Sequence, residues 1–172
     1  MTPTCILPMD KKRWTIFSII ALIVAFAIFA GGVSLVKTTK ENAARPAPAQ
    51  ITSRIIKEMN YTDMAEVSWN QLSKHYNIPD GVIADSSLYM SKSSDSASEL
   101  ACFLLTDKSK FTQLQTAITN HINSKATGFK SLNPAQYNLL KNSLVTQNGK
   151  YVLVSVGSND SAEAKMFNEI LK

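Results

Sequence analysis

The sequence predicts an α+β protein. An N-terminal transmembrane helix precedes a two-layer domain, in which two helices pack on one face of a four-stranded, mainly antiparallel sheet. Two observations carry this prediction: a long uncharged segment near the start, and two later pairs of strand-like runs that are each followed by an amphipathic stretch. The chain has 172 residues, 45% hydrophobic and 18% charged, which suits one folded domain with an appendage.

The uncharged segment runs from Trp14 to Val36 and directly follows Lys11, Lys12 and Arg13. A helix of that length spans about 34 Å, enough to cross a hydrocarbon core. Because a basic cluster before a first membrane helix stays in the cytoplasm, residues 1–13 are expected to form a cytoplasmic tail. Residues 14–36 then form a single-pass signal anchor, and the rest of the chain is extracytoplasmic.

A cleaved signal peptide is the alternative interpretation of this segment. Two sites offer cleavage: Ala25-Phe26-Ala27 and the small run Ala30-Gly31-Gly32. The apolar run is longer than the usual core of a signal peptide, which favours the uncleaved anchor. Cys5 precedes the apolar run, so it does not stand where a lipoprotein cysteine would.

Residues 37–50 predict a linker, because they are polar, rich in alanine and contain Pro46 and Pro48. The domain is then expected over residues 51–172. Apolar residues at helical spacing predict a first helix over 51–59. Ser68 and Gln71 form a capping-box signature for a second short helix that ends near Asn77.

The first strand pair is expected over residues 82–90 and 99–106, joined by a serine-rich loop. An apolar stripe on every third or fourth residue predicts a helix over 108–125. Pro134 at a first helical position predicts a short helix that ends near Lys141.

The second strand pair is expected over residues 144–147 and 150–157, around the hairpin signal Asn148-Gly149. A last helix follows from Asp160 to Leu171. The order strand-strand-helix therefore occurs twice, as a weak ββα-ββα pseudo-repeat. It predicts that both long helices cover one face of the sheet.

The opposite face of this sheet is too apolar to lie bare in water. Either the helices within residues 51–76 cover it, which is the favoured interpretation, or a partner does. The candidate interaction surface consists of this face and the hydroxyls of the serine-rich loop: Leu100, Cys102, Leu104, Tyr151, Leu153, Ser91, Ser93, Ser94 and Ser96.

No catalytic, cofactor-binding or metal-binding motif is recognisable in the sequence. His75 and His121 are expected to be surface or half-buried side chains, and Cys102 an inert thiol within an apolar strand. Asp107 and Asp160 are expected to cap helices. The formal net charge of +5 is dispersed, without a basic run between aromatic residues, so no nucleic-acid partner is expected.

Several spread-out positions resemble a known bacterial family. They include Tyr89-Met90-Ser91, the segment from Ser98 to Phe103, the run from Asn133 to Tyr137 and the run from Gly149 to Leu153. Residues 51–172 resemble the family known as domain of unknown function 4358 (DUF4358). The resemblance implies a small extracytoplasmic domain behind a signal, anchor or lipoprotein segment. It implies no activity, ligand or site residue.

These observations favour a membrane-anchored binding module of the bacterial cell envelope, without catalysis and with an envelope protein as partner. One alternative is a hydrolase-like envelope enzyme, whose site would gather His75 or His121 with carboxylates or Cys102 only in the fold. The other is a structural subunit of a membrane complex. Its anchor would pack through small residues such as Gly31, Gly32 and Ser34.

Overall fold

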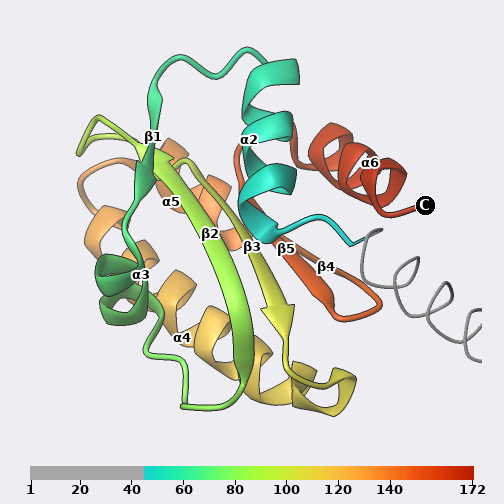
Figure 1. The fold of residues 1–172 in the computed structure, drawn as a ribbon. Coiled ribbons are helices and arrows are strands. Elements are labelled where there is room, and N and C mark those ends of the chain that lie inside the picture. Colours follow the sequence, from blue (N-terminus) through green and yellow to red (C-terminus); the bar gives the residue numbers. More distant parts are fainter. Residues whose placement is uncertain (1–44) are drawn as a thin grey trace, which may run out of the picture. The chain divides into compact units, whose positions relative to one another are not determined.

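The computed structural model describes residues 45–172 (Figure 1). The predicted tail, signal anchor and most of the predicted linker lie outside these residues. Residues Pro46–Lys172 form one compact unit. Within the described part of the chain, no helix has both the length and the apolar character needed to span a bilayer.

The sheet has five antiparallel strands in the order β1-β2-β3-β5-β4. Four of them are the predicted ones, and the fifth corrects the expected count. Its four residues pair along the outer side of β2 and carry too short an apolar pattern to be recognised in the sequence. The strands are β1 (Met64–Val67), β2 (Ile83–Ser91), β3 (Glu99–Leu105), β4 (Leu144–Asn148) and β5 (Tyr151–Val156).

The two most apolar strands, β3 and β5, lie at the centre of the sheet and pair with each other. Cys102 lies opposite Leu153, and Ala101 lies opposite Val154. The hairpin between β4 and β5 is confirmed. Its turn is one residue later than expected, because Asn148 pairs with Tyr151 and Gly149 has a φ of 62°.

Three helices cover the first face of the sheet: α3 (Trp69–Tyr76), α4 (Phe111–Phe129) and α5 (Pro134–Lys141). A short 3-10 turn, Lys108–Lys110, precedes α4. The core on this face combines one side of each central strand with the apolar stripes of the helices. Its largest members are Tyr76, Leu88, Phe103, Leu105, Leu114, Ile118 and Leu140.

Two helices cover the second face: α2 (Pro48–Glu58) and α6 (Asp160–Ile170). The domain therefore has three layers, with helices on both sides of the sheet (Figure 1). The prediction of two layers is wrong, because an apolar stripe shows that a helix is buried but not against which face. The second core contains Ile51, Ile55, Met64, Leu100, Cys102, Tyr151, Leu153 and Phe167.

Helix α2 begins inside the predicted linker, with Pro48 in its first turn. The side chain of Gln50 accepts a hydrogen bond from the Ala47 amide at 2.9 Å, which satisfies a free donor at the helix start. The hydroxyls of Thr52 and Ser87 are hydrogen-bonded at 2.7 Å and fix α2 to β2. The expectation that residues 51–76 cover the second face holds for α2 alone, because α3 lies on the first face.

Candidate functional site

The apolar part of the predicted interaction surface is covered in the folded domain. Leu100, Cys102 and Leu153 are buried beneath α2 and α6, and Leu104 is half-buried. Tyr151 is also buried, and its hydroxyl donates a hydrogen bond to the Pro46 carbonyl at 2.8 Å. This face is an internal core and offers no open surface to a partner.

The serine-rich loop remains at the surface, with Ser93 and Ser94 exposed and Ser91 and Ser96 half-buried. Several of its hydroxyls bond within the loop itself. The Ser91 hydroxyl accepts from the Ser93 amide at 3.1 Å, and the Ser96 hydroxyl donates to Ser98 at 3.1 Å. These bonds stabilise the turn between β2 and β3.

Cys102 lies on the second face, whereas His121 packs on the first. Burial, together with the negative charge of Asp85, raises the pKa of the Cys102 thiol. A thiolate is the reactive form of cysteine, so this thiol is inert in the folded domain. The structure thus separates the cysteine from the histidine with which a nucleophilic pair would be made.

Glu99 lies at the centre of a buried polar network on the first face. Its Oε1 accepts a hydrogen bond from the Tyr76 hydroxyl, and its Oε2 accepts from Lys125 Nζ at 2.7 Å. His121 Nε2 lies 3.0 Å from both carboxylate oxygens. On the other side of the ring, His121 Nδ1 donates to the His75 carbonyl at 3.0 Å. Through these bonds Glu99 connects β3 to α3 and α4.

The electrostatics of this network favour an ionised carboxylate. Burial alone would raise the pKa of Glu99, but the hydrogen bonds and positive charges of His121 and Lys125 outweigh it and lower the pKa to about 2. Burial and the adjacent Glu99 charge raise the pKa of Tyr76. Both ring nitrogens of His121 lie within hydrogen-bond distance of oxygen atoms, Nδ1 of the His75 carbonyl and Nε2 of the Glu99 carboxylate.

Every polar atom of the Glu99 carboxylate and the His121 ring has an intramolecular partner. A general acid or base needs an atom within reach of a substrate, and this network leaves none free. His75 contributes its backbone carbonyl, while the residue itself is exposed. The network is therefore a structural clamp between helices and sheet.

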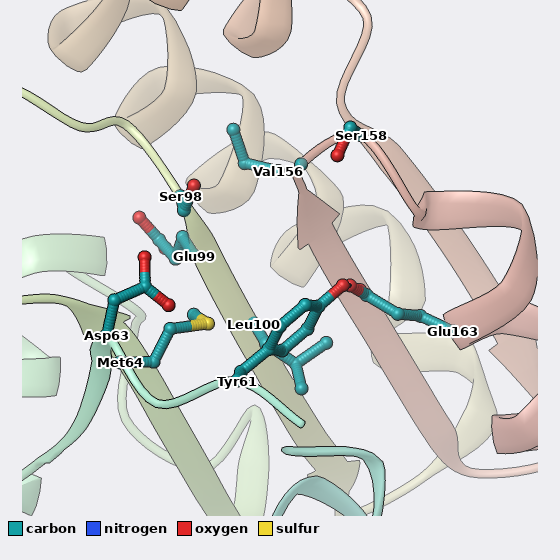
Figure 2. Close-up of a pocket in the computed structure, with 10 residues that line it drawn as sticks. Tyr61, Asp63, Met64, Ser98, Glu99, Leu100, Val156, Ser158 and Glu163 are labelled. Carbon is teal, nitrogen blue, oxygen red and sulfur yellow. The ribbon is translucent and has the colours of Figure 1, made fainter. Parts of the chain in front are cut away.

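A pocket of about 170 Å³ opens where β3 begins and β5 ends (Figure 2). The segment after α2 contributes Tyr61, Asp63 and Met64, and the first turn of α6 contributes Glu163. Figure 2 shows Asp63 and Met64 on one side and Glu163 on the other, with the Tyr61 ring reaching toward Glu163. The remaining lining residues are Ser98, Glu99, Leu100, Val156, Gly157 and Ser158.

Glu163 is the distinctive residue of this pocket, because it is only 3% exposed and only one of its two carboxylate oxygens has a hydrogen-bond partner. Its Oε1 accepts a hydrogen bond from the Tyr61 hydroxyl at 2.5 Å, and its Oε2 has no hydrogen-bond partner. Burial, then the hydrogen bond to Glu163, raises the pKa of Tyr61 to about 12. Burying a carboxylate oxygen without a hydrogen-bond donor costs free energy, and nothing in this position offsets the cost at Oε2.

The pocket lining contains three acidic side chains and no basic one. Glu99 is neutralised by its own network, whereas neither salt bridge found among the described residues involves Asp63 or Glu163. Over residues 45–172, no three His, Cys, Asp or Glu side chains gather closely enough to hold a metal ion. The negative potential of the pocket therefore comes from carboxylates that lack the geometry of a metal site.

The sequence patterns do not single out Glu99 or Glu163, although each glutamate stands at a position where the pattern predicts an apolar residue. Glu99 shares the inward side of β3 with Ala101 and Phe103, where strand alternation predicts an apolar residue. Glu163 stands four and seven residues before Phe167 and Ile170, on the apolar stripe of α6. A charged residue on a stripe that must be buried is the observation that points to both.

The family model of the domain of unknown function DUF4358 matches residues 57–157. This range begins at the end of α2, contains the whole sheet and stops just before α6. Comparison with curated proteins, and with solved structures, finds no match to this chain. The match covers more than half of the 172 residues, and the chain belongs to the DUF4358 family.

Proposed function

We propose that this protein is a single-pass, membrane-anchored binding module of the bacterial cell envelope, which presents residues 46–172 outside the cytoplasm. The anchor is the uncharged run from Trp14 to Val36 behind a basic cluster. The module recognises its ligand by noncovalent contact and carries out no catalysis.

The observation that carries this proposal is the half-satisfied carboxylate of Glu163 inside a defined pocket. Binding sites combine an apolar lining with a few polar groups that fix the orientation of the ligand. Here Leu100 and Val156 supply apolar surface, while Glu163 and the serine hydroxyls supply the polar groups.

A binding experiment tests the module. The purified full-length protein is titrated with a panel of small cationic, anionic and neutral compounds, and amide resonances are followed by nuclear magnetic resonance. We expect at least one class to shift the resonances of Leu100 and Gly157, which line the pocket. If no compound shifts either resonance, the proposal is contradicted. It is also contradicted if the protein chemically converts one of the compounds.

A topology experiment tests the location separately. A single cysteine introduced at the exposed position Glu169, in a Cys5→Ser variant, is exposed to a membrane-impermeant thiol reagent in intact cells. Labelling without lysis is expected. Labelling that requires lysis would place the domain in the cytoplasm and contradict the proposed anchor orientation.

A further inference from the structure

We infer that the ligand of this pocket carries a protonated primary amine on a short aliphatic stem, and that Glu163 binds the ammonium group. The inference rests on the proposed function and specifies its ligand class. The ammonium group is supplied either by a small alkylamine or by the end of a lysine side chain.

The charge of the pocket selects a cation. Glu163 is buried with no cationic partner among the described residues, and Asp63 lies exposed at the same pocket. Burying an unpaired carboxylate is unfavourable, and a cation from outside removes that penalty. The N-terminal end of α6 offsets part of the charge of Glu163 through the helix dipole, but it provides no hydrogen bond to Oε2.

The unpartnered Oε2 selects a cation that donates hydrogen bonds. A primary ammonium group has three N–H donors. One of them satisfies Oε2 of Glu163 once that side chain turns to bring the buried Oε2 into the pocket, and Ser98 and Ser158 line the same pocket with hydroxyls as further acceptors. A quaternary ammonium group has no N–H and would leave Oε2 without a donor.

The size and apolar lining of the pocket select a short stem. A volume of about 170 Å³ corresponds to roughly five or six water molecules at about 30 Å³ each, so only a small molecule or a chain end fits. Met64, Leu100 and Val156 provide an apolar wall against which methylene groups can pack.

The test compares matched probes on the full-length protein by following the amide resonances of Leu100 and Gly157. The probes are 1-aminobutane, tetramethylammonium, 1-butanol and butyrate. We expect 1-aminobutane to bind and the other three to bind at least about tenfold more weakly. A second titration with Nα-acetyl-lysine amide distinguishes the two sources of the ammonium group. A site for the end of a lysine side chain binds this compound as tightly as 1-aminobutane, whereas a site for a small amine binds it more weakly.

Three variants assign the binding to Glu163. Glu163→Gln removes the charge and should weaken 1-aminobutane at least about tenfold. Glu163→Asp keeps the charge but withdraws the carboxylate by one methylene, and it should weaken binding as well. Glu169→Gln removes an exposed carboxylate from the same helix and should leave binding unchanged.

The outcomes separate the inference from the proposed function. If 1-butanol or butyrate binds as well as the amine, or if Glu163→Gln binds the amine unchanged, the amine inference is overturned while the pocket remains a binding site. If no compound of any charge class shifts the pocket resonances, both fail. A folded Glu163→Asp variant keeps the test valid even if Glu163→Gln does not fold.

Discussion

Glu99 and Glu163 are both buried glutamates that accept a tyrosine hydrogen bond, yet their surroundings differ. Glu99 receives Tyr76, His121 and Lys125, and both of its oxygens are occupied. Glu163 receives Tyr61 and keeps one oxygen without a partner. The difference teaches that burial of a charge does not by itself mark a site. The satisfied carboxylate holds the fold together, and the half-satisfied one faces a pocket.

The largest expected effect in this comparison is the loss of Glu99. Glu99→Gln places an amide N–H group against the N–H donors of His121 and Lys125 and should lower the free energy of unfolding by about 3–5 kcal/mol. Urea denaturation of the full-length protein measures it. Glu169→Gln, on an exposed site, should change stability by less than about 0.5 kcal/mol. A loss below about 1 kcal/mol for Glu99→Gln would show that the network is not a clamp.

The same clamp predicts a pH dependence. The pKa of Glu99 is about 2 in the folded protein, against 4.5 for an unperturbed glutamate, so the unfolded chain takes up the proton first. Its stabilising contribution is complete above about pH 4.5 and is lost as the pH falls toward 2. Urea midpoints measured from neutral to acidic pH should fall less steeply in Glu99→Gln than in the wild type. Parallel profiles would contradict this.

A smaller effect concerns Tyr61, which reports on Glu163. The pKa of Tyr61 is raised to about 12 by burial and by its hydrogen bond to Glu163. In Glu163→Gln the charge is gone and the burial remains, so the pKa should fall toward 10 without reaching it. Carbon nuclear magnetic resonance of the phenol ring measures this, and Tyr61→Phe identifies the signal. An unchanged pKa would mean that Tyr61 does not donate to Glu163.

The smallest expected effect is on the stability of Glu163→Gln. The substitution removes a buried charge whose Oε2 has no donor, and the new amide can still accept from Tyr61. The free energy of unfolding should therefore change by less than about 1 kcal/mol, or rise, because the cost of burying an uncompensated charge is removed with the carboxylate. A loss as large as that of Glu99→Gln would show that Glu163 is as structural as Glu99.

Most of the secondary structure was predictable from local patterns. Strand alternation and the Asn148-Gly149 signal located β2 to β5, while apolar stripes, the capping-box signature at Ser68 and the proline Pro134 located the helices. The short strand β1 was missed because pairing with Leu88 to Ser91, rather than its own pattern, makes it a strand. The side of the sheet on which α6 packs was predicted wrongly, because it depends on the connection after β5 and not on the helix itself.

The candidate site was less predictable, because it is assembled from distant segments. Tyr61 and Glu163 are 102 residues apart in the chain, and neither belongs to a motif. The pattern of α6 placed Glu163 among apolar residues, but helix capping explained it equally well. Only the fold shows that one carboxylate oxygen of Glu163 accepts a hydrogen bond from Tyr61, while the other has no hydrogen-bond partner.

The strand order has a consequence for the biogenesis of the protein. Strand β3 pairs with β5, so the centre of the sheet joins segments that emerge from the ribosome about fifty residues apart. Until β5 follows, Leu100 and Cys102 lack their cross-strand neighbours on that side, Ser155 and Leu153, and until α6 follows, the pocket lacks Glu163. Before β5 follows, one edge of the apolar strand β3 is unpaired, and unpaired strand edges make a partly folded chain prone to aggregation. The pocket is complete only after the last helix has been synthesised.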